Sequence, residues 1–130
     1  MQICNYILKE QHNNINAINL IGLSLIQQKK YIDAEKKLVK GLSINENNVA
    51  LLNSLGKLYF EIWDLNKSEK FYLKALEINS KSYQTLNNLA GFYLETNNSF
   101  KALDYYNKAF SIIPKEPTIH INLSKTYLSL

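Results

Sequence analysis

Hydrophobic and polar residues alternate along this chain in a pattern that repeats every 34 residues. Aligned with itself from Ile15, the sequence forms blocks at 15–48, 49–82 and 83–116 and a partial fourth block at 117–130, without a gap. About eight positions hold the same kind of side chain in every block. Self-similarity at one constant period predicts a protein built from a repeated supersecondary unit.

The hydrophobic positions within a block follow helical spacing. They stand at block positions 4, 7, 8 and 11, and again at 20, 24, 27 and 28. Residues three or four apart share one face of an α-helix, so each block is predicted to be two amphipathic helices joined by a short turn. Positions 8, 20 and 27 are small, which lets the two helices approach closely. These small residues are Gly22, Gly56, Ala90 and Ser124, then Ala34, Ser68 and Ala102, and then Gly41, Ala75 and Ala109.

Large side chains accompany the small ones at the predicted seam between the two helices of a block. Position 4 holds Ile18, Leu52, Leu86 and His120, and position 11 holds Leu25, Tyr59, Tyr93 and Tyr127. We expect these side chains to lie in the core, with His120 partly buried. The same location argues against the tyrosines forming an exposed stripe on which nucleic-acid bases stack.

Polar residues between the blocks favour helix starts. Asn47, Asn48, Ser80 and Ser82 can each cap the first helix of the block that follows. Pro117 suits the first turn of the last helix, because the N–H group that proline lacks would have no partner within the helix at that position.

The N-terminal segment, 1–14, fits the same grid when the grid is extended backwards. Cys4, Ile7 and Leu8 then fall on block positions 24, 27 and 28. We therefore predict that residues 2–11 form a capping helix, which is similar to the second helix of a preceding block and covers the first helix of block one.

The last predicted helix, residues 118–130, has no second helix of its own. Terminal repeats need a polar outer face, yet this helix carries Tyr127, Leu128 and Leu130. Three interpretations stay open. The chain is a piece of a longer array, or this end meets another surface, for example in self-association, or the apolar end frays.

This pattern resembles the tetratricopeptide repeat family over residues 15–130. The proline that is frequent in this family near the block end occurs here only as Pro114. The equivalent residues of the other two blocks are Glu46 and Ser80. The resemblance implies an all-α, right-handed solenoid of antiparallel helix pairs. It also implies that the first helix of each pair lines a concave face, which binds peptides or helices of partner proteins.

Asparagines are concentrated on that expected face. Block positions 5 and 6 hold Asn in five of eight cases, namely Asn19, Asn53, Asn87, Asn88 and Asn122. An amide both donates and accepts hydrogen bonds, so such a row can bond an extended peptide backbone, as in the asparagine ladder of O-linked N-acetylglucosamine transferases, which it resembles. The alternative is that these amides cap or link neighbouring blocks.

Charges on the same face are sparse. Lys57 and Lys125 stand at position 9, and Glu61 and Glu95 at position 13. One subclass of the family grips the C-terminal carboxylate of chaperones, and only Asn88 matches its clamp, so we reject that subclass. The two glutamates lie on equivalent positions of successive blocks, where no pocket is expected to make them a catalytic pair.

Composition narrows the function further. The chain has 130 residues, a formal charge of +4 and 15 basic side chains, none of them arginine. The mild charge and the missing guanidinium forks argue against nucleic acid as a partner. The single cysteine, Cys4, fits a reducing compartment, and no stretch reaches the roughly 20 apolar residues of a membrane span. His12, His120 and Cys4 lack metal-ligand spacing. We expect a cytoplasmic protein without a cofactor, metal or membrane contact.

These observations predict a non-catalytic scaffold that binds a peptide or helix of a partner protein. The candidate contacts are the concave-face residues Asn19, Asn53, Lys57, Glu61, Asn87, Asn88, Glu95, Asn122 and Lys125. The alternative is an N-terminal recruiting arm of a larger enzyme, such as a glycosyltransferase or sulfotransferase, with the catalytic part absent from this chain.

Overall fold

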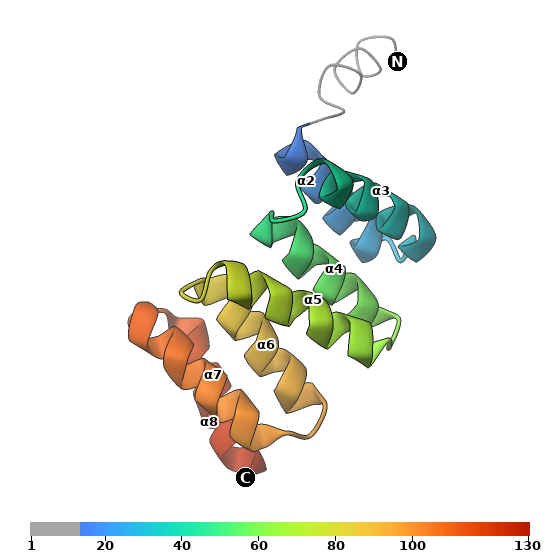
Figure 1. Cartoon of the computed structure of the whole chain (residues 1–130). Coiled ribbons are helices and arrows are strands. Elements are labelled where there is room, and N and C mark those ends of the chain that lie inside the picture. Colours follow the sequence, from blue (N-terminus) through green and yellow to red (C-terminus); the bar gives the residue numbers. More distant parts are fainter. Residues whose placement is uncertain (1–13) are drawn as a thin grey trace. The chain divides into compact units, whose positions relative to one another are not determined.

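The computed structural model describes residues 14–130, and this part of the chain consists of α-helices without strands (Figure 1). The helices are α2 (Ile15–Gln27), α3 (Tyr31–Ile44), α4 (Val49–Glu61), α5 (Leu65–Ile78), α6 (Tyr83–Glu95), α7 (Ser99–Ile112) and α8 (Pro117–Ser129). Equivalent helices begin 34 residues apart. The prediction of an all-α fold built from helix pairs is confirmed, and the helix predicted over residues 2–11 lies outside the described residues.

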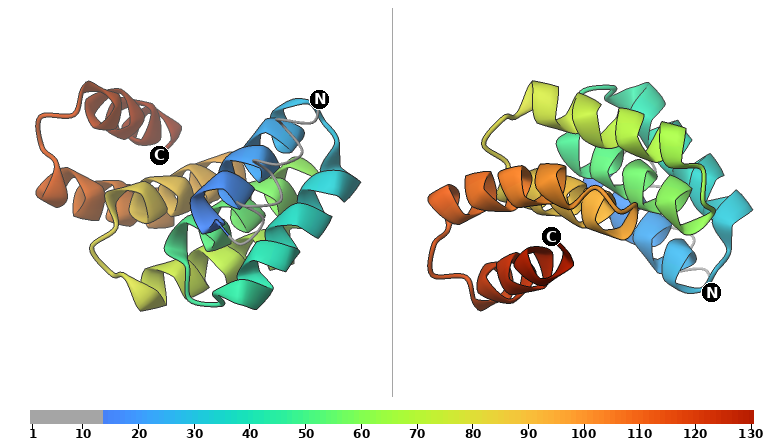
Figure 2. Two further views of the ribbon diagram at one scale, coloured as in Figure 1. Left: turned by 90° about the horizontal axis from the view of Figure 1, so that it is seen from above. Right: turned by 90° about the horizontal axis from the view of Figure 1, so that it is seen from below.

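The described chain divides into two compact units. The first unit ends at Ser68 and the second runs from Glu69 to Leu130, so that the boundary falls inside α5. In the first unit α3 packs against both α2 and α4. In the second unit α7 packs against both α6 and α8, which can be followed in Figure 2 as the gold, orange and red helices.

Small residues set the distance between the helices of a pair. A Cβ atom added to Gly22 would lie 2.4 Å from Cδ2 of Leu38, which is fully buried. One added to Gly41 would lie 2.8 Å from Cγ2 of Ile18 and 3.1 Å from Cδ1 of Leu51. Ser68 is also fully buried, and its hydroxyl donates to the carbonyl of Gly56 at 2.7 Å. The prediction that small residues line the seam is therefore confirmed at these positions.

Each pair closes through the same turn. After α2, the N–H of Lys30 donates to the carbonyl of Leu25 and the N–H of Lys29 to that of Ile26, at 2.8 and 2.9 Å. This is a Schellman motif, in which the residue after the helix takes a left-handed conformation. Lys29, Trp63 and Asn97 occupy that position with φ of 62°, 64° and 63°. Glycine, which has no Cβ to clash there, is absent from all three turns.

The hydrogen bonds at the helix starts show which of the candidate residues act as N-caps. Asn48 accepts from the N–H of Leu51 at 3.0 Å, and Ser82 accepts from that of Thr85 at 3.2 Å. The caps are therefore Asn48 and Ser82, and their neighbours Asn47 and Ser80 do not fill that position. Pro117 is the first residue of α8, as predicted.

A tyrosine at block position 11 joins one block to the preceding one. Tyr93 donates to Oε2 of Glu69 at 2.7 Å, while Nζ of Lys101 lies 5.0 Å from the centre of the tyrosine ring. Tyr59 bonds Glu35 in the same way, with Nζ of Lys67 5.2 Å from its ring centre. Burial and then Glu35 raise the pKa of Tyr59 to about 12. The predicted burial is correct for Tyr59 and Tyr93.

The first prediction concerns the left-handed residue of the turn. Changing Lys29→Gly should raise the free energy of unfolding by roughly 1 kcal/mol, because a side chain in this conformation costs about that much. Thermal unfolding followed by circular dichroism measures the effect. Lys30→Gly is the matched control. Its φ is −90°, so glycine there should be neutral or destabilising, and equal effects of the two changes would contradict the explanation.

The second prediction concerns the seam. Gly22→Ala should lower the free energy of unfolding by about 1–2 kcal/mol, because the added methyl forces the buried Leu38 to move. Gly91→Ala should instead raise it by about 0.5–1 kcal/mol, the usual gain in helix propensity. The nearest atom to a Cβ on Gly91 is the Tyr106 hydroxyl oxygen, at 3.7 Å. Denaturant titration of both variants checks the opposite signs.

The third prediction concerns the tyrosine links. Tyr59→Phe should cost about 1.5–3 kcal/mol near neutral pH, because it removes a hydrogen bond to a charged group. Folding raises the pKa of Tyr59 from 10.0 to about 12, so the wild-type advantage should be complete below pH 10 and lost as the pH rises through 12. Unfolding measured from pH 7 to 12 tests this. Tyr127→Phe, at the equivalent but exposed position, should change little at any pH.

Candidate functional site

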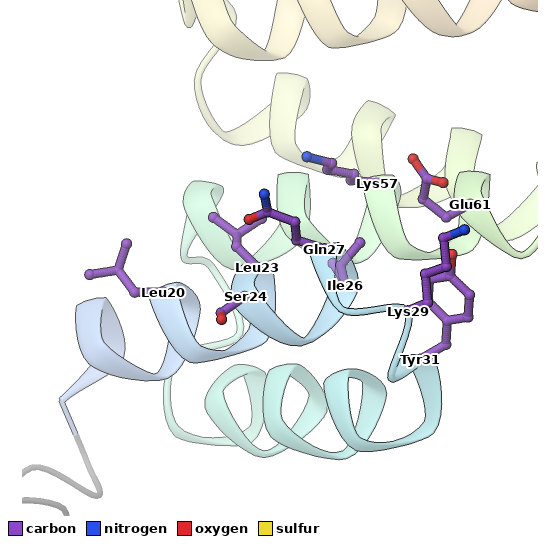
Figure 3. A pocket seen from close by; sticks show the side chains of 9 residues that line it. All are labelled: Leu20, Leu23, Ser24, Ile26, Gln27, Lys29, Tyr31, Lys57 and Glu61. Carbon is purple, nitrogen blue, oxygen red and sulfur yellow. The ribbon is translucent and has the colours of Figure 1, made fainter.

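A pocket of about 630 Å³ lies in the first unit between α2, α4 and the start of α3. Figure 3 shows the side chains around it. Its walls are formed by Leu20, Leu23, Ser24, Ile26, Gln27, Lys29, Tyr31, Lys57 and Glu61. The pocket is a feature of the first helices of blocks one and two, which is where the sequence predicted a binding face.

The two ends of the pocket differ chemically. Leu20 stands at one end and is 67% exposed, although it is a large apolar residue. Lys29, Tyr31 and Glu61 line the other end of the pocket (Figure 3). Lys57 reaches in from α4. The site therefore offers apolar surface next to both signs of charge and a phenol.

Lys57 and Glu61 are the predicted residues that the structure places in this pocket. They lie four residues apart on α4, so both project from the same side of that helix. Both side chains are exposed, and among the described residues they form no ion pair with each other. Their charges are therefore available to a ligand.

The asparagines of the first unit lie away from the pocket. Asn19 accepts a hydrogen bond from the hydroxyl of Ser54, which connects α2 to α4. Asn53 is only 4% exposed. These residues stabilise the helix packing, which is the structural alternative weighed for the asparagine row, and a direct ligand contact by them stays a prediction.

A second asparagine bond repeats the first in the other unit. The amide of Asn122 donates to Oδ1 of Asn87 at 3.3 Å and so connects α8 to α6. The two bonded residues are 35 positions apart, as are Asn19 and Ser54. Position 5 of one block therefore bonds position 6 of the next in both units. Asn88 is half-buried beside this link.

The remaining predicted residues of the second unit face solvent. Glu95 and Lys125 are both exposed. Burial and then the charge of Glu95 raise the pKa of Tyr106 to about 12. No part of the structure tests whether Glu95 or Lys125 contacts a ligand, and their assignment stays a prediction.

Sequence reasoning missed the apolar half of the pocket. Leu20 stands at block position 6, which holds Ser54, Asn88 and Asn122 in the other blocks, and Leu23 stands at position 9, which holds Lys57, Gly91 and Lys125. Lys29 was missed as well, because it lies in the turn after α2 and not on a first helix. A signal was available in Leu20, which is apolar where the other blocks all carry a polar residue.

Two expectations for α8 are also wrong. His120 is exposed rather than partly buried, and its Nε2 lies 2.9 Å from the carbonyl oxygen of Pro114. Tyr127 is 58% exposed rather than in the core. Both stand at positions that are buried in α4 and α6, and the difference is that no second helix covers α8 within the described chain.

Two features are absent from residues 14–130. No group of three histidine, cysteine, aspartate or glutamate side chains in this range is placed to hold a metal ion. Nor does any helix in this range have the length and apolar character needed to cross a bilayer.

Sequence comparisons identify the repeat directly. One profile described as a tetratricopeptide repeat matches residues 49–82, and another with the same description matches residues 71–104. The first match coincides with the second block of the sequence grid, whereas the second match begins inside α5. No curated protein matches the chain.

Solved structures share the fold at low sequence identity. PilF of Pseudomonas aeruginosa has a TM-score of 0.83 at 22% identity, over 92% of this chain and 55% of PilF. The first TPR of Spaghetti (RPAP3), bound to the HSP90 peptide SRMEEVD, has a TM-score of 0.79 at 16% identity, over 88% and 91% of the two chains. The Yersinia enterocolitica chaperone SycD, in complex with a peptide of the translocator YopD, has a TM-score of 0.76 at 15% identity, over 89% and 94%.

The 34-residue period, the paired helices with small residues at their seam, and the two profile matches agree with one another. Residues 49–104 therefore consist of tetratricopeptide repeats, and the described helices before and after them keep the same period.

Proposed function

We propose that this chain is a non-catalytic interaction module that binds a peptide or helix of a partner protein, with the pocket of α2 and α4 as a principal contact. The observation that carries the proposal is Leu20, an apolar side chain held 67% exposed beside the charged residues Lys57 and Glu61. Leu20 is not isolated, because Leu23 and Ile26 line the same pocket, and an apolar surface with a polar rim is typical of protein-interaction sites. The proposal places the chain in the cytoplasm.

The structural relatives support this proposal. The Spaghetti domain is described with an HSP90 peptide and SycD with a YopD peptide. Both match most of this chain in fold. Because their sequences are only 16% and 15% identical to this one, the chemistry of the partner is inferred from this chain's own residues.

The chemistry of the pocket indicates how a partner is held. A large apolar side chain of the ligand fits beside Leu20 and Leu23, where its burial supplies most of the affinity. Lys29 and Lys57 can bond carbonyl or carboxylate oxygens, and Glu61 can accept from a backbone N–H or a basic side chain. Because only Asn88 matches the family's carboxylate clamp, the ligand is held by internal residues rather than by its C-terminal carboxylate.

The fourth prediction tests the pocket. Peptides selected from a random 12-residue phage library on the purified chain should carry a large apolar residue. Their affinity should fall at least about tenfold for Leu20→Asp, a loss of roughly 1.4 kcal/mol. Fluorescence anisotropy with synthetic peptides measures the change.

Ile32→Asp is the matched control. Ile32 is 75% exposed, lies in the same unit and is absent from the pocket walls, so this change should leave affinity within about twofold. Amidating the peptide C-terminus should also have little effect. If Leu20→Asp and Ile32→Asp bind alike, the pocket is not the binding site, and if amidation abolishes binding, a carboxylate clamp operates after all.

A further inference from the structure

Tyr106 of α7 is a buried tyrosine whose hydroxyl group forms no hydrogen bond within residues 14–130. Its side chain is only 3% exposed. The hydroxyls of the buried Tyr59 and Tyr93 have partners, because they bond Glu35 and Glu69. Buried polar groups are normally hydrogen-bonded. The hydroxyl of Tyr106 thus has no structural use within the described helices and remains available to a group from outside.

This hydroxyl reaches the protein surface beside Gly91 of α6. The hydroxyl oxygen of Tyr83 is enclosed and has no partner among the described residues, whereas that of Tyr106 is not enclosed. A Cβ atom added to Gly91 would lie 3.7 Å from the Tyr106 hydroxyl oxygen. Apart from the chain neighbours of Gly91 and the backbone of α6, no other atom of residues 14–130 lies within 4 Å of that point. The space that a side chain at residue 91 would fill is therefore open, with the phenol at its edge.

Glu95 supplies a negative charge next to this space. It follows Gly91 by four residues, so both project from the same side of α6. Its side chain is exposed and forms no ion pair within the described chain. Burial, and then the charge of Glu95, raise the pKa of Tyr106 to about 12. The hydroxyl therefore keeps its proton at neutral pH, and its oxygen can still accept a hydrogen bond.

The equivalent positions of α4 show which group is missing here. Block positions 9 and 13 hold Lys57 and Glu61 in block two, and both residues line the pocket of the first unit. Block three keeps the glutamate as Glu95 but has Gly91 in place of the lysine. An ammonium group at position 9 lies within reach of a carboxylate four residues later. Glu95 thus lacks the cation that the repeat places on this side of the helix in block two.

We propose that Gly91, Glu95 and Tyr106 form a subsite for a basic side chain, lysine or arginine, of the partner peptide. The cationic group occupies the open space beside Gly91. Its N–H groups donate to the carboxylate of Glu95 and to the hydroxyl oxygen of Tyr106. This inference rests on the proposed function, because the ligand is the same partner, but it uses residues of the second unit alone.

Other occupants fit this subsite less well. The charge of Glu95 repels an acidic side chain. An apolar side chain would cover the carboxylate and the phenol without replacing their hydrogen bonds to water, which costs free energy. The lysines of α7 are engaged elsewhere, because Lys101 lies over the ring of Tyr93 and Lys108 pairs with Asp104.

The test titrates N-acetyl-arginine amide into the ¹⁵N-labelled full chain and follows the amide resonance of Gly91 by NMR. We expect a saturable shift, with affinity reduced at least about threefold by Glu95→Gln and by Tyr106→Phe. Gly91→Lys should abolish the shift caused by the probe, because its own ammonium then reaches Glu95. N-acetyl-citrulline amide has the shape of the arginine probe without its charge and should not bind.

Glu77→Gln and Tyr105→Phe are the matched controls. Glu77 is an exposed glutamate of the same unit, and Tyr105 is the neighbour of Tyr106 on α7, so both variants should bind the arginine probe like the wild type. Glu95→Gln and Tyr106→Phe should leave the melting temperature within about 2 °C of the wild type, because neither group has a partner within the described chain. A clear loss of stability in Tyr106→Phe would contradict the proposal, since its hydroxyl would then serve the fold.

A second measurement uses the phage-selected peptides and replaces each of their basic residues by citrulline. One replacement should weaken binding to the wild type at least about threefold and should have no effect on binding to Glu95→Gln. The proposal is overturned if no replacement is coupled to Glu95 in this way and the arginine probe gives no saturable shift at Gly91. Sensitivity of the same peptides to Leu20→Asp would then leave the proposed function intact. Indifference to Leu20→Asp would instead contradict the pocket, while coupling to Glu95 would still support the subsite.

Discussion

The close approach of two helices across small residues is the constraint on which the rest of this structure depends. Gly41 illustrates it, because a Cβ there would meet both Ile18 of α2 and Leu51 of α4. One glycine on α3 therefore sets the distance of that helix from two first helices at once. Since α2 and α4 are both seated on α3, their separation is fixed, and the pocket between them is a consequence of the seam.

The polar residues of the first helices divide into two groups for the same reason. Those that point toward a neighbouring first helix bond it, as Asn19 bonds Ser54 and Asn122 bonds Asn87. Those about one turn further along, such as Lys57 and Glu61, reach solvent beside the apolar wall. A partly buried hydrogen bond connects the two helices that form the pocket walls, and the exposed charges remain available for recognition.

Periodicity predicted the helices, their turns and the seam, because each depends on which residues share a helix face. It could not predict what lies opposite that face. Asn19 and Lys57 occupy the same side of their helices, yet one bonds a neighbour and the other lines a pocket. Tyr127 has the same block position as Tyr59 and is nevertheless exposed. Lys29 lines the pocket although it belongs to the turn after α2 and not to a first helix. These outcomes depend on tertiary neighbours, which residue spacing does not encode.

The difference in burial between Tyr59 and Tyr127 also has an energetic consequence. A helix face that meets only water gains nothing from a small residue such as Ser124 or from an aromatic ring such as Tyr127, and polar residues are the usual choice there. Large apolar side chains release about 1.5–3 kcal/mol each when they become fully buried. On α8, Ser124, Tyr127 and Leu128 are exposed, so they do not contribute this free energy of burial. Small and large residues nevertheless alternate there as they do at a helix seam. This alternation has a physical use only when a second helix lies against it, as α7 lies against α6.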